Sequence, residues 1–244
     1  MTDHTFSPRQ TITGLLCQMH ASGFNPADLQ RTQQVYRVTC LMFSGRVRKT
    51  ERVFICHAVG AASAMVEFGG DLAQVLGAML HAAYDSGQFP DGRIGGDRAS
   101  HRRWLASQAG ADVEEITFRY ARFPFHAGDP ERLLEQGFSV EDSDLLFIAL
   151  AHELDDMMDL GLRFAAKYGK DLEQRLNACE KLANQLGQPE LAKALRSGLE
   201  SYADADWTDP LASETLHGYV IVPGFIGYLR QRYYHWRGRH TRVQ

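Results

Sequence analysis

The chain has 244 residues, of which 44% are hydrophobic, and its 26 basic and 30 acidic side chains leave a formal net charge of −4. This length and apolar content suffice for one sizeable core, and the weak negative charge gives no reason to expect binding to nucleic acid or to an anionic membrane. No stretch approaches the roughly 18 uncharged apolar residues that a membrane span requires, so we expect no transmembrane segment.

The N-terminus and the cysteines indicate a cytoplasmic protein. The first residues, MTDHTFSPRQ, lack the basic segment and apolar run of a secretory signal. The four cysteines form no CxxC pair and no regular spacing, which is typical of reduced thiols rather than of a disulfide framework.

The pattern predicts helices along nearly the whole chain. The first helix is expected to begin after Pro8, and a second at Pro26, with Asn25 as its N-cap. A basic loop, SGRVRKTER (44–52), then precedes a helix rich in small residues, VFICHAVGAASAMVEF (53–68).

Gly69 and Gly70 are expected to end that helix, and Asp71 to cap the next one, DLAQVLGAMLHAAYDSG (71–87). Residues 87–97 form a glycine-rich loop of the kind that often covers a binding site. Further helices are predicted at about 98–108, 111–123, 144–169, 171–186, 188–202 and 222–236.

Strand signals are weak. Only residues 117–123 and 219–222 have even a mild strand-like composition. We therefore predict an all-α fold in one domain (1–244), with a core of about 30–200 and a C-terminal extension of about 203–244.

Histidines and aspartates recur at helical spacing. His81 and Asp85 are four residues apart, and so are His152 and Asp156; residues at positions i and i+4 share one face of a helix. His57 lies in the preceding helix among small apolar residues. We therefore expect three histidines, from three helices, to face the core.

Neutral imidazoles with carboxylates nearby are typical ligands of zinc, iron, manganese or a similar divalent ion. A bound ion lowers the pKa of a water molecule or polarises a phosphoryl oxygen, and a carboxylate beside it can act as a general base. The same pattern also suits histidines that are hydrogen-bonded within a core and bind nothing. Spacing alone leaves both interpretations open.

Two segments resemble the hydrolase domain of the RelA/SpoT family, within the HD superfamily. The first runs from Arg48 to Asp85 (RKTERVFICHAVGAASAMVEFGGDLAQVLGAMLHAAYD), and the second from Leu145 to Gly187, with LLFIALAHELDDMMDL and NACEKLANQLG. Together they cover about a third of the chain. The resemblance implies an HD-type helical core with additional C-terminal helices.

The resemblance also implies roles for individual residues. His57 corresponds to the first metal ligand of the family and His81 to the second. Arg48 corresponds to an arginine that stacks on a guanine base, and Asp85 to the first acidic catalytic position. Asp156 replaces an asparagine that contacts the substrate sugar or a water.

The chain departs from the family at three positions. Ala82 stands where the family has a metal-binding aspartate, Ser86 where it has a second catalytic acid, and His152 where it has the last metal-binding aspartate. Two carboxylates are thereby lost near the metal and one histidine is gained. Three histidines favour a softer ion than manganese, such as zinc or iron.

The sequence thus predicts a metal-dependent HD-type hydrolase, specifically a phosphohydrolase that acts on a small, anionic, phosphorylated or nucleotide-like substrate. One divalent ion would be held by the metal ligands His57, His81 and His152. The attacking water would be positioned or deprotonated by Asp85 or Asp156, and phosphate charge would be neutralised by Arg48 and Arg93.

Two alternatives remain open. In the first, the chain is a catalytically inactive HD scaffold that binds a nucleotide or a protein partner. In the second, it is an HD-fold metal enzyme of another reaction type, such as an oxygenase or a lyase. A two-iron oxygenase would recruit His101 and His126, although it would also need the aspartate that Ala82 replaces. A homo-oligomer is compatible with each of these hypotheses.

Another set of basic residues follows the glycine-rich loop. Together with one tyrosine, these side chains are candidates for lining an anionic pocket: Arg102, Arg103, Arg119, Tyr120 and Arg122.

Overall fold

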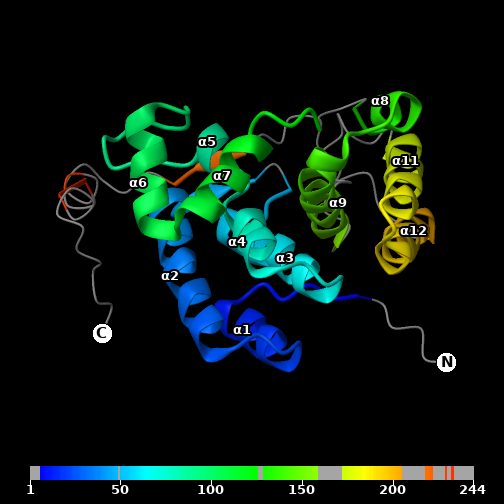
Figure 1. Cartoon of the computed structure of the whole chain (residues 1–244), viewed down its shortest axis with the longest axis horizontal. Coiled ribbons are helices and arrows are strands. Elements are labelled where there is room, and N and C mark those ends of the chain that lie inside the picture. The colour runs from blue at the N-terminus through cyan, green and yellow to red at the C-terminus, as the bar shows by residue number, and fades with distance from the viewer. Residues whose placement is uncertain are drawn as a thin grey trace.

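The computed structural model describes residues 6–48, 50–125, 129–158, 172–204, 218–221, 229 and 232–233. Over these residues the chain is all-α, as predicted, and its strands are confined to one pair of two residues each (Figure 1). None of the helices in this part of the chain is long and apolar enough to cross a membrane.

The elements follow one another in this order: α1 (Ile12–Ala21), α2 (Pro26–Phe43), β1 (Arg46–Val47), α3 (Phe54–Glu67), α4 (Leu72–Leu80), α5 (Ala83–Ser86), α6 (Ala99–Ala109), α7 (Ala111–Tyr120), α8 (Asp129–Gln136), the 3₁₀ turn η1 (Val140–Asp142), α9 (Ser143–Met157), α11 (Leu172–Gln185), α12 (Pro189–Asp204) and β2 (Tyr219–Val220).

Local capping determines where several of these helices begin. The side chain of Asn25 accepts hydrogen bonds from the backbone of Ala27 and Asp28, and the Asp28 carboxylate accepts from the backbone of Asn25. Asp71 and Gln74 form the same reciprocal arrangement at the start of α4. Both predicted helix starts are therefore confirmed. Such caps stabilise a helix by about 0.5–2 kcal/mol each.

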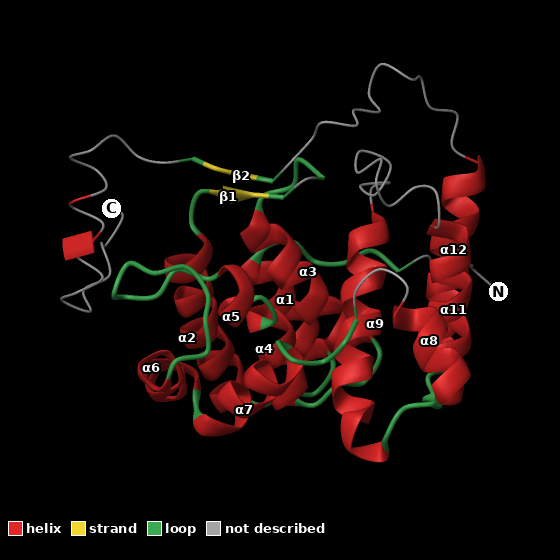
Figure 2. Ribbon diagram, turned by 90° about the horizontal axis from the view of Figure 1, so that it is seen from above, coloured by secondary structure: helices red, strands yellow, loops and turns green. Residues whose placement is uncertain are grey.

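The core is built around α3, which packs on both α4 and α9. Its run of alanine, glycine and serine lets the neighbouring helices approach closely, and nearly all of its residues are buried. Helices α8, α11 and α12 pack together on the outer side of α9, as the two views show (Figure 2). On the other side, α2 packs on α4 and α6, and α7 packs on α4.

The prediction of one continuous helix over 71–87 is wrong, because α4 ends at Leu80 and the short α5 begins at Ala83. In a continuing helix, the carbonyl of Ala78 would accept a hydrogen bond from the backbone of Ala82. Here the His81 ring reaches back to that carbonyl, with Nδ1 at 2.8 Å, and the His81 backbone N–H lies 3.4 Å from it. A side chain that competes for a backbone acceptor in this way disfavours continuation of the helix.

The helix predicted at about 111–123 is confirmed as α7, which continues to Tyr120, so the mildly strand-like composition of residues 117–123 produces no strand there. Thr117 is buried, and its hydroxyl donates to the carbonyl of Val113 at 2.8 Å. Packing of α7 on α4 therefore overrides the strand preference of these side chains.

The signal over 219–222 is confirmed in part. Residues 219–220 form β2, which pairs antiparallel with β1, Arg46 opposite Val220 and Val47 opposite Tyr219. This pairing places the loop before α3 against a segment near the end of the chain (Figure 2).

Most of the predicted helix 222–236 and the second half of the predicted helix 144–169 lie outside the described residues, as does His126. The helices predicted at 171–186 and 188–202 are confirmed as α11 and α12.

Candidate metal centre

Three histidines converge where α3, α4 and α9 meet. His57 comes from the first turn of α3, His81 from the residue that ends α4, and His152 from the middle of α9. Their ring centroids are 5.0 Å (His57–His81), 4.8 Å (His57–His152) and 4.7 Å (His81–His152) apart. One nitrogen from each ring lies within 4.8 Å of the others, which is close enough for all three to hold one metal ion.

The hydrogen bonds of two of these rings leave one nitrogen of each available to a metal ion. Nδ1 of His81 faces the carbonyl of Ala78 at 2.8 Å, and Nδ1 of His57 faces Oδ2 of Asp155 at 2.6 Å. When Nδ1 carries the proton in each ring, both Nε2 atoms present lone pairs. These Nε2 atoms lie 3.3 Å apart and face each other. A histidine that donates from one nitrogen to a carbonyl or carboxylate is the usual form of a metal-binding histidine.

The Asp155 carboxylate, which orients His57, is itself held in place by Arg52. Arg52 donates to both oxygens of Asp155, at 2.7 and 2.8 Å, and also to its backbone carbonyl at 3.0 Å. Asp155 is fully buried, and it fits beside α3 because residue 60 is glycine: a Cβ atom on Gly60 would overlap the Asp155 carboxylate. Burial raises the pKa of Asp155 to about 7, while Arg52 opposes this rise.

A second ion pair lies beside the first. Arg48 donates to both carboxylate oxygens of Asp156, with Nη2 at 2.9 Å from Oδ2, and its Nη1 also lies 3.0 Å from Nδ1 of His57. The two side chains are only 15% and 9% exposed. Burial on its own would raise the pKa of Asp156, but the charges of Arg48 and His152 hold that pKa well below its usual range. Asp156 is therefore ionised.

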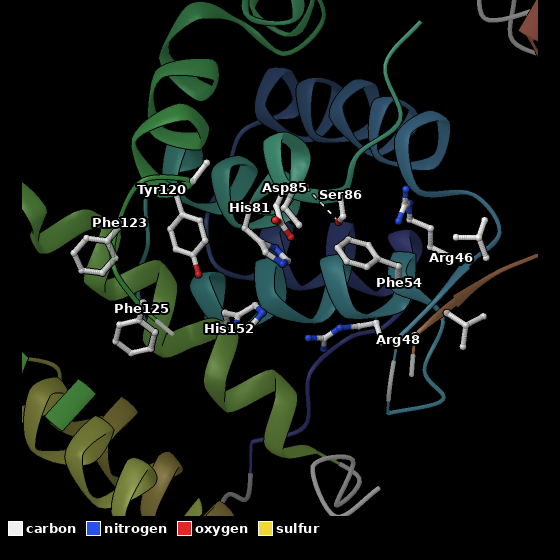
Figure 3. A pocket seen from close by; sticks show the side chains of 15 residues that line it. Arg46, Arg48, Phe54, His81, Asp85, Ser86, Tyr120, Phe123, Phe125 and His152 are labelled. Atoms are coloured by element: carbon white, nitrogen blue, oxygen red, sulfur yellow. Dashed lines mark hydrogen bonds between the residues drawn. The ribbon is translucent and has the colours of Figure 1, made fainter. Parts of the chain in front are cut away.

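A cavity of about 520 Å³ opens beside the histidines (Figure 3). His81 and His152 form part of its wall, with arginines on one side and aromatic rings on the other. Its volume lies within the range of small-molecule sites. The remaining lining residues are Arg46, Val47, Arg48, Phe54, Ala82, Asp85, Ser86, Tyr120, Ala121, Phe123, Phe125, Gly218 and Val220.

The other predicted site residues divide into those at the cavity and those away from it. Asp85 lines the cavity from α5 and is exposed, but it is not among the groups close enough to share an ion with the histidines. Arg48 also lines it, although its guanidinium is engaged by Asp156 rather than open for stacking on a base. Arg93 does not line the cavity; its side chain is 55% exposed and lies 3.9 Å from Asp91.

His101 does not join the centre. Its ring stacks on Phe89 with centroids 3.8 Å apart, and its two nitrogens face the carbonyl of Gly96 at 2.7 Å and Oδ2 of Asp91 at 3.0 Å. His101 thus holds the glycine-rich loop in place.

Of the five residues predicted to line an anionic pocket, only Tyr120 lines this cavity. Arg102 pairs with Glu114 and Glu115, and Arg122 with Asp97. Arg119 donates to the carbonyl of Glu141.

Three residues that shape the centre were given no role in it from the sequence: Asp155, Arg52 and Gly60. Asp155 carried a signal, because it follows His152 by three residues and so lies near the same face of α9. Its pairing with His57, 98 residues away, and with Arg52, 103 residues away, is visible only in the folded chain.

Both buried histidines are held neutral. Burial, followed by the charge of Arg48, lowers the pKa of His57 well below its usual value. Burial, followed by the charge of His152, lowers the pKa of His81 from 6.5 to about 3. Neutral imidazoles are the form that binds a metal, so the site is prepared for an ion without loss of a proton.

These pKa values predict how the stability of the metal-free protein depends on pH. Below about pH 6.5 the unfolded chain takes up protons that the folded rings do not, so the free energy of unfolding should fall as pH drops from about 6.5 towards about 3. His81→Asn removes one of these groups, so the free energy of unfolding of this variant should fall less steeply with falling pH than that of the wild type. Urea denaturation from about pH 7.5 to about pH 4.5 measures the two slopes.

His20 is exposed on α1, and His20→Asn provides the matched control. Equal slopes for the wild type and His81→Asn would show that His81 does not have the low pKa described above.

Comparison with models of known protein families gave no match, and comparison with curated proteins gave none either. The geometry of the site therefore carries the functional argument.

Proposed function

We propose that the chain is a metal-dependent hydrolase with an HD-type helical core, and that it releases phosphate from a small anionic substrate. One observation carries this proposal: three histidines lie within ligand distance of one another, and two of them, His81 and His152, form part of the wall of a cavity that also presents arginines. A concave site with few charged groups and an ion-binding wall is the usual form of a hydrolytic centre.

The resemblance to the RelA/SpoT hydrolase domain supports the same proposal. Its two segments contain α3, α4 and all but the first two residues of α9, which are the helices that bring the histidines together. His57 and His81 are the positions at which the resemblance implies ligands, and His152 lies beside them in place of the last aspartate.

The donor set fits a divalent ion that prefers nitrogen, so zinc or iron suits it better than manganese. Three neutral ligands leave the charge of such an ion uncompensated, and bound there it would lower the pKa of a water towards about 7 and attract anions.

Other groups of the protein would orient the histidine rings, bind the phosphate and accept a proton. Asp155 and the carbonyl of Ala78 orient the two buried rings. Arg46 is held at the cavity and offers a positive charge to a phosphate. Asp85 is the one carboxylate among the described residues that line the cavity, whereas Asp156 is held by Arg48, so Asp85 is the better candidate to accept a proton from the attacking water.

The test is phosphate release by protein loaded separately with zinc, iron (without oxygen) or manganese, with p-nitrophenyl phosphate and a panel of nucleotides as substrates. We expect hydrolysis with zinc or iron, and a fall in kcat of about 10²- to 10⁴-fold in Asp85→Asn. Glu115→Gln, an exposed acid outside the cavity, is the matched control and should keep wild-type kcat.

Absence of both bound metal and hydrolysis would reject the proposal. If a nucleotide still bound to such metal-free protein, the inactive scaffold would be the better description. A two-iron oxygenase gains no support, since His101 is engaged by the glycine-rich loop and His126 lies outside the described residues.

A further inference from the structure

Building on the proposed function, we infer that Tyr120 is a further catalytic residue, whose hydroxyl donates a hydrogen bond to an oxygen of the tetrahedral phosphoryl group bound at the histidines. Three observations support this role: the position of Tyr120 at the cavity, the lack of a hydrogen-bond partner for its hydroxyl among the described residues, and the contrast with Tyr84, whose hydroxyl has a partner.

Tyr120 is placed at the cavity by the end of α7. It is the last residue of that helix, and its ring meets the His81 ring edge-on, with centroids 6.1 Å apart and planes at 81°. Figure 3 shows the hydroxyl pointing towards the part of the cavity where His81 and His152 lie. An anion bound to those histidines would come within reach of this hydroxyl.

The hydroxyl of Tyr120 makes no hydrogen bond to the part of the chain that the structure describes. Tyr84 differs in this respect, because its hydroxyl donates to Glu114 at 2.6 Å. Tyr120 is half-buried and lines the cavity, so its hydroxyl is placed to bind a group that enters there.

Because a protonated phenol donates a hydrogen bond, the group that would bind the Tyr120 hydroxyl is a hydrogen-bond acceptor. A phenol has a pKa of about 10 and is protonated at neutral pH. A protonated hydroxyl donates to an oxyanion and does not replace a histidine as ligand or Asp85 as base.

A phosphoryl group would then meet donors from two sides, the arginine side of the cavity with Arg46 and the aromatic side with Tyr120 (Figure 3). Charge on the equatorial oxygens must be stabilised in the transition state of phosphoryl transfer. Removal of one preorganised donor to a developing oxyanion typically lowers kcat about 10²- to 10³-fold.

The test compares Tyr120→Phe with Tyr84→Phe in the zinc-loaded, full-length protein. We expect Tyr120→Phe to lower kcat roughly 10²-fold, with the zinc Kd and the Tm as in the wild type. Tyr84→Phe, which loses the bond to Glu114, should show the reverse: a lower Tm and wild-type kcat. Inorganic phosphate serves as a second probe, and it should bind Tyr120→Phe about tenfold more weakly than the wild type.

The outcomes separate the inference from the proposed function. If the zinc-loaded wild type neither binds phosphate nor hydrolyses an ester, both are rejected. If the wild type does both, and Tyr120→Phe equals it in kcat and in phosphate Kd, only the role of Tyr120 is overturned. A loss of zinc affinity or of Tm in Tyr120→Phe would make Tyr120 a structural residue and would also overturn the inference.

Discussion

Replacing any one of His57, His81 and His152 with alanine is expected to abolish stoichiometric zinc binding. Each ring supplies one nitrogen to a shared space, and a tetrahedral site with only two protein ligands is not a usual zinc site. The fall in affinity should exceed the roughly 10- to 100-fold loss that follows removal of a group hydrogen-bonded to a ligand. Isothermal titration of the metal-free proteins with zinc measures it.

His20→Ala is the control, since His20 is exposed on α1 and should leave one zinc per chain. His152→Ala is the most informative of the three variants, because His152 is less buried than the other two and its loss disturbs the core least. Wild-type zinc affinity in a folded His152→Ala protein, as judged by circular dichroism, would exclude the three-histidine site.

Arg48→Met is expected to destabilise the metal-free protein by about 3–5 kcal/mol. The substitution leaves the ionised Asp156 nearly buried without its partner, and breaking a buried pair on one side carries this cost. The double variant Arg48→Met/Asp156→Leu should recover most of the loss, because it removes both charges and keeps the volume filled. Urea denaturation at neutral pH measures the free energy of unfolding of each variant.

Arg93→Met provides the comparison for this pair. Arg93 is exposed, so its loss should change the free energy of unfolding by no more than about 0.5 kcal/mol. If Arg48→Met cost no more than Arg93→Met, the pair formed by Arg48 and Asp156 would not be a structural element of the centre.

The helices and their starts were predictable because they depend on short-range chemistry. Asn25 and Asp71 cap helices through residues within three positions of themselves. Helical spacing predicted that His57, His81 and His152 face the core. Side chains that face inward from neighbouring helices of one core lie close to one another.

Other features depended on contacts between distant segments and were not predictable. The end of α4 at Leu80 arises from the His81 ring, whose choice of acceptor the residue pattern does not encode. The place of Asp155 beside His57 requires Arg52 and the missing side chain of Gly60, which lie on other segments of the chain. Arg93 was assigned to phosphate because of its charge and its place in the glycine-rich loop, and it does not line the cavity.

The central claim is that His57, His81 and His152 hold one metal ion, and anomalous X-ray diffraction from crystals of the zinc-loaded protein tests it most directly. We expect one anomalous peak per chain between the three rings, about 2.0–2.1 Å from one nitrogen of each. A zinc-saturated crystal with no peak between these rings, or with its ion bound elsewhere, would contradict the account.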